Sequence, residues 1–196
     1  FVTNITTNTF GTNPAKWEST QYSWQTVADA AIENAKAVAD GANVIFDISP
    51  TGRLMEPIGE YTFQEAYNNF RQIVEYTASK VDGYLLETFA DLYEIKAAVL
   101  AIKENSNLPV FATMTFDNTL HTLSGSTPGI VALTLSSLGV DALGVNCSES
   151  PDIVLEVVKR MKPFASVPLL AQANKGLPQL INGTVVYNYT DEMFAE

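Results

Sequence analysis

The stretch "ALGVNCSESPDIVLEVVKR", residues 142–160, decides the fold. An apolar run leads to Asn146 and Cys147, and a helix-starting sequence follows with Pro151 at a first helical position. Strands that read as continuous apolar runs, without alternation, are typical of parallel sheets that are buried on both faces. The stretch therefore predicts a β-strand followed directly by an α-helix, which is the repeating unit of an α/β fold.

The same unit recurs along the chain. Further helices are expected over residues 26–42, 62–80, 91–106 and 127–139, with a last one starting after Thr190. Thr62 and Glu65 form a capping-box pattern at the start of the second of these helices. Six strands are expected, beginning near Ile5, Asn43, Gly83, Pro109, Ala142 and Pro168.

Two architectures fit this alternation, an open doubly wound sheet and a (β/α)8 barrel. Six strands favour the open sheet, because a barrel needs eight strands and typically about 250 residues. No glycine-rich nucleotide-binding fingerprint follows any strand. Polar residues do follow nearly every strand, and in a barrel all strand ends meet at one mouth, so these residues favour the barrel.

Composition bounds the function classes. The 196 residues are 46% hydrophobic and 17% charged, as expected for one globular domain spanning residues 1–196. A net charge of −11 argues against binding to nucleic acid or anionic membranes. No apolar run approaches the roughly 18 residues of a membrane span. A single cysteine excludes an internal disulfide and fits a reducing, cytoplasmic setting.

The residues alone leave several interpretations of the candidate site open. Cys147 is either a small buried thiol or a reactive group, but the one histidine, His121, lies in a polar loop typical of the surface. A zinc site takes about four ligands, which one cysteine cannot supply. Glu87, after an apolar run, is a neighbour of a helix N-cap, half of an ion pair, or an anchor for a substrate ammonium group. Asp47 and Asp91 are interpreted as turn or capping residues.

Seven segments together resemble the zinc-dependent homocysteine S-methyltransferases, and most of all the homocysteine-binding module of cobalamin-dependent methionine synthase. The resemblance covers essentially the whole chain, and its motifs occur in the family's order. They are "TTNTFGTN" (6–13), "SPTGRLMEPIG" (49–59), "LLETFADLYEIKAA" (85–98), "ATMTFD" (112–117), "TLSGSTP" (122–128), "GVNCS" (144–148) and "LLAQANKGLP" (169–178).

The resemblance implies a partial (β/α)8 TIM barrel in which this chain supplies about strands two to seven. It also implies that Cys147 is the first of three zinc-ligating cysteines. The other two form a "GGCCG" motif on strand eight of the family, and neither this motif nor the family's first-strand "DGAMGT" motif occurs here. We therefore expect a domain truncated at both ends, with a chain that is inactive by itself.

Residue roles follow from the same resemblance. Glu87 matches the carboxylate that holds the homocysteine ammonium group, and Thr7 lies where the family contacts the substrate. Asn146 matches the asparagine that orients the site beside the zinc cysteine. Ser49 and Thr51 fall in a loop near the amino acid.

The implied reaction is zinc-dependent transfer of a methyl group to the thiolate of homocysteine, giving methionine. The implied donor is methylcobalamin with methyltetrahydrofolate, delivered by a corrinoid- or folate-binding domain or protein, although betaine, S-methylmethionine and S-adenosylmethionine serve other relatives. Two alternatives stay open. One is a zinc-independent barrel methyltransferase or lyase, and the other is an inactive amino-acid-binding fragment.

Overall fold

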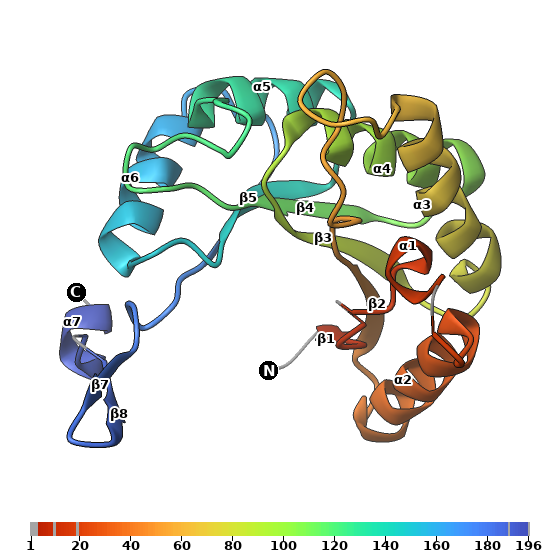
Figure 1. Cartoon of the computed structure of the whole chain (residues 1–196), viewed down its shortest axis with the longest axis horizontal. Helices are drawn as coiled ribbons and strands as arrows, with labels where there is room; N and C mark the ends of the chain where they lie inside the picture. The colour runs from red at the N-terminus through yellow and green to blue at the C-terminus, as the bar shows by residue number, and fades with distance from the viewer. Residues whose placement is uncertain (1–3, 10, 19, 188, 196) are drawn as a thin grey trace.

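Six parallel strands form one curved sheet with helices along its convex side (Figure 1). The computed structural model describes residues 4–9, 11–18, 20–187 and 189–195. The strands follow one another in chain order across the sheet. They are β1 (Asn4–Thr6), β2 (Asn43–Ile48), β3 (Gly83–Phe89), β4 (Val110–Met114), β5 (Ala142–Asn146) and β6 (Leu169–Gln172). All six expected strands are present, and the sheet is a curled half-barrel, which confirms the predicted partial α/β barrel.

The helices begin where their capping residues lie. Thr62 and Glu65 make the reciprocal bonds of a capping box, and the Asp91 side chain accepts a hydrogen bond from the Tyr93 backbone, as the sequence predicts. The short helix α1, capped by Asn13, was not expected. The helices are α1 (Pro14–Trp17), α2 (Trp24–Val38), α3 (Phe63–Thr77), α4 (Leu92–Asn105), α5 (Pro128–Ser137), α6 (Pro151–Met161) and α7 (Asp191–Ala195).

The main core lies between the sheet and the helices. Alternate residues of β2, Val44, Phe46 and Ile48, belong to this core together with Phe70 of α3 and Leu86 of β3. Burying each such side chain stabilises the fold by roughly 1.5–3 kcal/mol. The strand residues that alternate with these core residues point to the concave side, because successive side chains of a strand face opposite ways. Asp47 and Glu87 therefore project from the concave face.

Gly144 of β5 permits close contact with β6. A Cβ atom at this position would lie 1.9 Å from the carbonyl oxygen of Leu170, its register partner. No residue other than glycine fits there without moving β6. Strands β6 and β1 are the two edges of the sheet, since each has one neighbouring strand.

A hairpin that the sequence interpretation missed follows the sheet. Strands β7 (Gln179–Ile181) and β8 (Thr184–Val186) pair antiparallel and lie apart from the curved sheet (Figure 1). Asn182 and Gly183 connect them with φ values of 51° and 80°, and Asn-Gly is a strong hairpin signal. Leu180 is 75% exposed, so the hairpin packs little apolar surface.

The search for membrane-spanning helices is negative. Within the described residues, none of the helices combines the length and the apolar character needed to cross a bilayer.

Candidate functional site

The carboxyl end of β3 departs from regular strand geometry. Its register with β4 shifts between Leu86 and Phe89, so two residues occupy an irregular segment there. Thr88 has a φ of 59°, which is unusual for a β-branched residue. The carboxyl ends of strands β1 to β6 form one rim of the sheet. Glu87 and Thr88 are both half-buried at this rim. In a regular strand, two neighbouring side chains would face opposite sides of the sheet.

Thr88 is bonded to Asn146 across the intervening strand β4. Its backbone N–H donates to Asn146 Oδ1 at 3.0 Å, and Asn146 Nδ2 donates to Thr88 Oγ1 at 2.6 Å. Asn146 is 1% exposed, so this reciprocal pair satisfies an amide that would otherwise be buried without partners. The pair brings the predicted residue Asn146 next to Thr88, which follows the predicted residue Glu87.

Cys147 follows Asn146 and is exposed. It has a φ of 48°, and its backbone is held on two sides. Its N–H donates to the Gln172 carbonyl at 3.2 Å, and Thr115 Oγ1 donates to the Cys147 carbonyl at 3.3 Å. The thiol therefore stands on a fixed backbone at the end of β5.

The described residues do not complete a metal site. A thiolate is a ligand that zinc favours, so Cys147 fits the predicted role. In the described part of the chain, however, no group of three or more His, Cys, Asp or Glu residues is placed to hold a metal ion. His121 bonds to Thr119 within its own loop. One thiol is thus the full contribution that these residues make to a zinc centre.

Asp47 and Glu87 form a carboxyl pair. Asp47 lies in β2 and is 3% exposed, so its interpretation as a turn or capping residue is wrong. Its register partner on β3 is Leu85, so Glu87, two residues further along β3, is its diagonal neighbour on the concave face. Burial raises the pKa of Asp47 to about 8, and the charge of Glu87 adds to the rise. The sequence offered a signal for this, because Asp47 interrupts the apolar run of β2.

Thr7 ties the end of β1 to β2. Its Oγ1 accepts the Asp47 backbone N–H at 3.2 Å and lies 2.6 Å from Thr9 Oγ1. Because the Thr9 hydroxyl donates to the Asp47 carbonyl at 2.6 Å, Thr7 is the donor in the contact between the two threonines. Thr7 is 4% exposed, so its side chain is buried where it makes these two hydrogen bonds.

Ser49 and Thr51 are also buried, behind the rim. Lys16 Nζ donates to Ser49 Oγ at 2.8 Å. The Thr51 N–H and hydroxyl both donate to Glu94 Oε1, at 2.7 and 2.6 Å. Burial raises the pKa of Glu94, and the hydrogen bonds from Thr51 oppose the rise. Glu94, Thr88 and Lys16 are site neighbours that the sequence interpretation did not single out.

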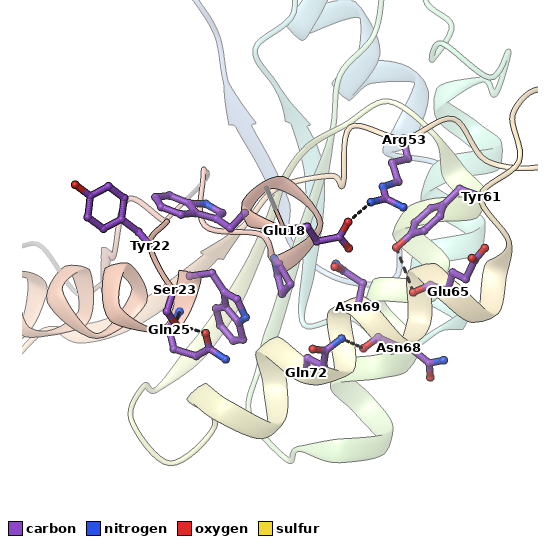
Figure 2. A pocket seen from close by; sticks show the side chains of 13 residues that line it. Glu18, Tyr22, Ser23, Gln25, Arg53, Tyr61, Glu65, Asn68, Asn69 and Gln72 are labelled. Carbon is purple, nitrogen blue, oxygen red and sulfur yellow. Dashed lines mark hydrogen bonds and ion pairs between the residues drawn. The ribbon is translucent and has the colours of Figure 1, made fainter. Parts of the chain in front are cut away.

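A pocket of about 470 Å³ lies between the first two helices and α3 (Figure 2). Trp17, Trp24 and Tyr61 supply aromatic walls, and an ion pair of 2.6 Å joins Arg53 to Glu18. None of the six residues predicted for the site lines it. The pocket is therefore separate from the rim that carries Glu87 and Asn146.

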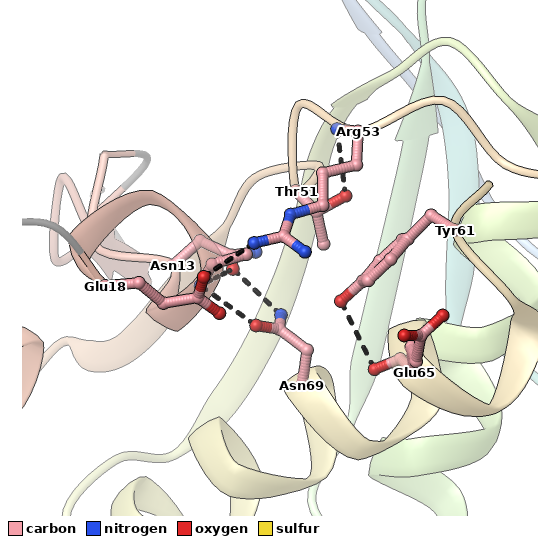
Figure 3. A network of polar contacts seen from close by, with 8 residues as sticks. Asn13, Glu18, Thr51, Arg53, Tyr61, Glu65 and Asn69 are labelled. Carbon is pink, nitrogen blue, oxygen red and sulfur yellow. Dashed lines mark hydrogen bonds and ion pairs between the residues drawn. The ribbon is translucent and has the colours of Figure 1, made fainter. Parts of the chain in front are cut away.

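A polar network connects the wall of this pocket to the loops of the rim (Figure 3). Asn69 of α3 donates to Asn13 Oδ1 at 2.8 Å and accepts from the Ala15 N–H at 3.0 Å. Asn13 in turn donates to the Ser49 carbonyl at 3.1 Å. The network fixes the loops after β1 and β2 against α3, which holds Ser49 in place.

Comparisons with known proteins agree with this fold. The metallated form of the homocysteine methyltransferase MmuM from Escherichia coli superposes with a TM-score of 0.72 at 18% identity, over 89% of this chain and 67% of that one. Betaine–homocysteine S-methyltransferase 1 of Sus scrofa is 35% identical over 155 residues, which are 76% of this chain and 53% of that protein. Methionine synthase of Mycobacterium tuberculosis is 36% identical over 104 residues, or 50% of this chain.

The chain spans only part of these relatives, 9% of the mycobacterial methionine synthase and 53% of the porcine enzyme. A family model described as homocysteine S-methyltransferase matches residues 2–196. On that match, which covers nearly all of the sequence, the chain belongs to the homocysteine S-methyltransferase family.

Proposed function

We propose that the protein transfers a methyl group to the sulfur of homocysteine, giving methionine, and that this chain supplies the amino-acid-binding part of the site. One observation carries the proposal. Glu87 is half-buried at the rim. The next residue, Thr88, is hydrogen-bonded to Asn146, which directly precedes Cys147, so these bonds connect the strand end of Glu87 to the strand end of Cys147. A family match over residues 2–196 supports the choice of substrate.

Glu87 is the group that we assign to the substrate ammonium. A carboxylate at a partly buried rim attracts a cation more strongly than one in bulk water, because the effective dielectric constant is lower there. Holding the ammonium group fixes the amino acid, so that its sulfur reaches the reacting methyl group. In the transfer, the homocysteine thiolate forms the new S–C bond, and the donor leaves with the electron pair of the broken bond.

Zinc remains part of the proposal with Cys147 as one ligand. Zinc bound by thiolates would keep the substrate sulfur deprotonated. Because the described residues offer one thiolate and no cluster of three ligands, the remaining ligands must come from elsewhere in the protein or from a partner.

The proposed reaction also needs a methyl donor. Methylcobalamin, charged from methyltetrahydrofolate and carried by a corrinoid- or folate-binding domain or protein, is the donor that the resemblance of the sequence implies, and a methionine synthase is among the relatives. Betaine is the second candidate, favoured by the porcine relative, which aligns with 76% of the chain. A cytoplasmic location remains our expectation from the single cysteine.

The proposal is tested with Glu87→Gln and Cys147→Ala in the whole protein that contains this chain. We expect Glu87→Gln to weaken homocysteine binding roughly tenfold or more, since it removes a charge-assisted contact. Cys147→Ala should lower methyl transfer by about a hundredfold or more. Titration calorimetry and a methionine-formation assay measure the two effects.

Glu33→Gln on α2 is the matched control, because Glu33 is exposed on a helix outside the rim. It should leave both quantities unchanged. Full methyl transfer by Cys147→Ala would instead favour a zinc-independent methyltransferase or lyase. Homocysteine binding without turnover in the unsubstituted protein would favour an inactive amino-acid-binding fragment.

A further inference from the structure

Asp47 is a buried carboxyl group whose hydrogen bonds are incomplete. Its backbone is fully engaged, since its N–H donates to Thr7 and its carbonyl accepts from Thr9. Its side chain is not, because Oδ1 is, among the described residues, the one buried side-chain polar atom without a hydrogen-bond partner. A buried acceptor left unpaired costs about 1–3 kcal/mol, and more when it is charged. This atom therefore needs a physical explanation.

Two charged groups face Asp47, Glu87 from β3 and Lys16 from α1. Lys16 is engaged elsewhere, since its Nζ donates to Ser49 Oγ at 2.8 Å, and it has the weakest effect of the groups that act on Asp47. Glu87 is the diagonal neighbour of Asp47 on β3, because Asp47 pairs with Leu85 in the register of the two strands. Two carboxylates in contact repel each other, so one of them keeps a proton. Burial selects Asp47 for that proton, in line with its pKa of about 8.

We propose that Asp47 is a positioning residue that stays protonated and donates its hydroxyl hydrogen to Glu87. A protonated carboxyl group is a hydrogen-bond donor, and a hydrogen bond from O–H to a carboxylate is among the short, strong ones. The shared proton completes the bonding of the Asp47 side chain. It also gives the pair a single negative charge and holds Glu87 in one orientation.

The charge of the pair sets what it can bind. A single negative charge matches one ammonium group, and a carboxylate held by a neighbour loses little side-chain entropy when a ligand arrives. This consequence rests on the proposed function, in which Glu87 receives the ammonium group of the amino acid. The shared proton itself does not depend on that function.

The first experiment detects the proton in this chain without any ligand. Infrared spectra near neutral pH should contain the C=O stretch of a neutral carboxylic acid, and Asp47→Asn should remove it. Asp40→Asn, at an exposed turn position, is the matched control and should retain the band. Absence of the band in the unsubstituted chain, or a band of undiminished intensity in Asp47→Asn, would overturn the proposal.

The second experiment measures homocysteine affinity in the whole protein. Asn at position 47 can still donate a hydrogen bond to Glu87, so Asp47→Asn should stay within about threefold of the unsubstituted affinity. Asp47→Ala removes the donor and should weaken binding roughly tenfold. Equal losses in both variants, with folding verified by circular dichroism, would contradict a positioning role.

The infrared experiment and the Glu87→Gln binding test together separate this proposal from the proposed function. The infrared band together with unchanged binding in Glu87→Gln would mean that the proton is shared but that Glu87 does not hold the substrate, so the proposed function fails. No band together with weakened binding in Glu87→Gln would mean that the proposed function stands and the role of Asp47 fails.

Discussion

The ends of β2 and β3 differ from the ends of β5 and β6. At the first pair, Asp47 is 3% exposed and Glu87 is half-buried, and Thr7 is bonded to the backbone beneath them. At the second pair, both Cys147 and Gln172 are exposed. The polar groups at the ends of β2 and β3 are thus enclosed by the described residues, while at the ends of β5 and β6 Asn146 is buried but Cys147 and Gln172 face solvent.

The difference follows from the place of each strand in the sheet. Strands β2 and β3 lie in the interior of the sheet, whereas Gln172 ends the edge strand β6 and Cys147 follows β5, the strand next to that edge. Side chains at interior strand ends are fixed by the packing and hydrogen bonds around them, which is what a preorganised binding site requires. The carboxyl pair is therefore enclosed within this chain, while the thiol is exposed beside the edge strand.

Gly144→Ala breaks the second region and should have the largest effect. Its Cβ would lie 1.9 Å from the Leu170 carbonyl oxygen, so β6 must move away from β5. We expect the free energy of unfolding to fall by about 3 kcal/mol or more. Urea unfolding measures the change.

Gly11→Ala is the control for this substitution, because a Cβ at Gly11 meets no heavy atom within 4 Å. It should change the free energy of unfolding by less than about 0.5 kcal/mol. Equal stability of the two variants would show that β6 is not held against β5 as described.

Asp47→Asn sharpens the description of the first region through pH. A raised carboxyl pKa means that the folded protein binds more protons than the unfolded chain between the ordinary value of 3.8 and about 8. Stability should therefore fall as pH rises through this window. Asp47→Asn lacks the titrating group, so its stability relative to the unsubstituted chain should increase by about 2 kcal/mol from pH 6 to pH 8.

Thermal or urea unfolding at both pH values measures this change. Asp40→Asn serves again as the control and should follow the pH dependence of the unsubstituted chain. A constant difference between Asp47→Asn and the unsubstituted chain at both pH values would show that Asp47 titrates normally.

Thr88→Val breaks the link between the two regions and should have the smallest effect. Valine keeps the branched shape at this strained position but removes Oγ1, so Asn146 Nδ2 loses its acceptor. We expect a loss of about 1 kcal/mol in the free energy of unfolding. Thr88→Ser keeps the hydroxyl and should be more stable than Thr88→Val. The reverse order in urea unfolding would contradict the described pairing.

The sequence predicted the sheet well because its signals are local. Apolar runs such as the one before Asn146 mark buried strands, and the pattern of Thr62 and Glu65 marks a helix start. The hairpin was missed although Asn182 and Gly183 are a local signal too. Its short flanking strands are exposed, so they show no buried run.

The site was predictable only in part. Glu87, Asn146 and Cys147 stand at strand ends, which the sequence indicates by itself. Asp47 was misinterpreted because its neighbour Glu87 is distant in sequence and meets it only when β2 pairs with β3. Thr88 could not be identified either, since its inward position depends on the irregular register between β3 and β4.

The sequence by itself determined the order of strands and helices and the residue types at the strand ends, because both depend on local pattern. The tertiary structure alone decided which of those end groups meet. It buried Asp47 against Glu87, bonded Thr88 to Asn146, and left Cys147 exposed. The reason is that pKa values, hydrogen bonds and exposure depend on neighbours in space, which strand pairing and curvature of the sheet bring together.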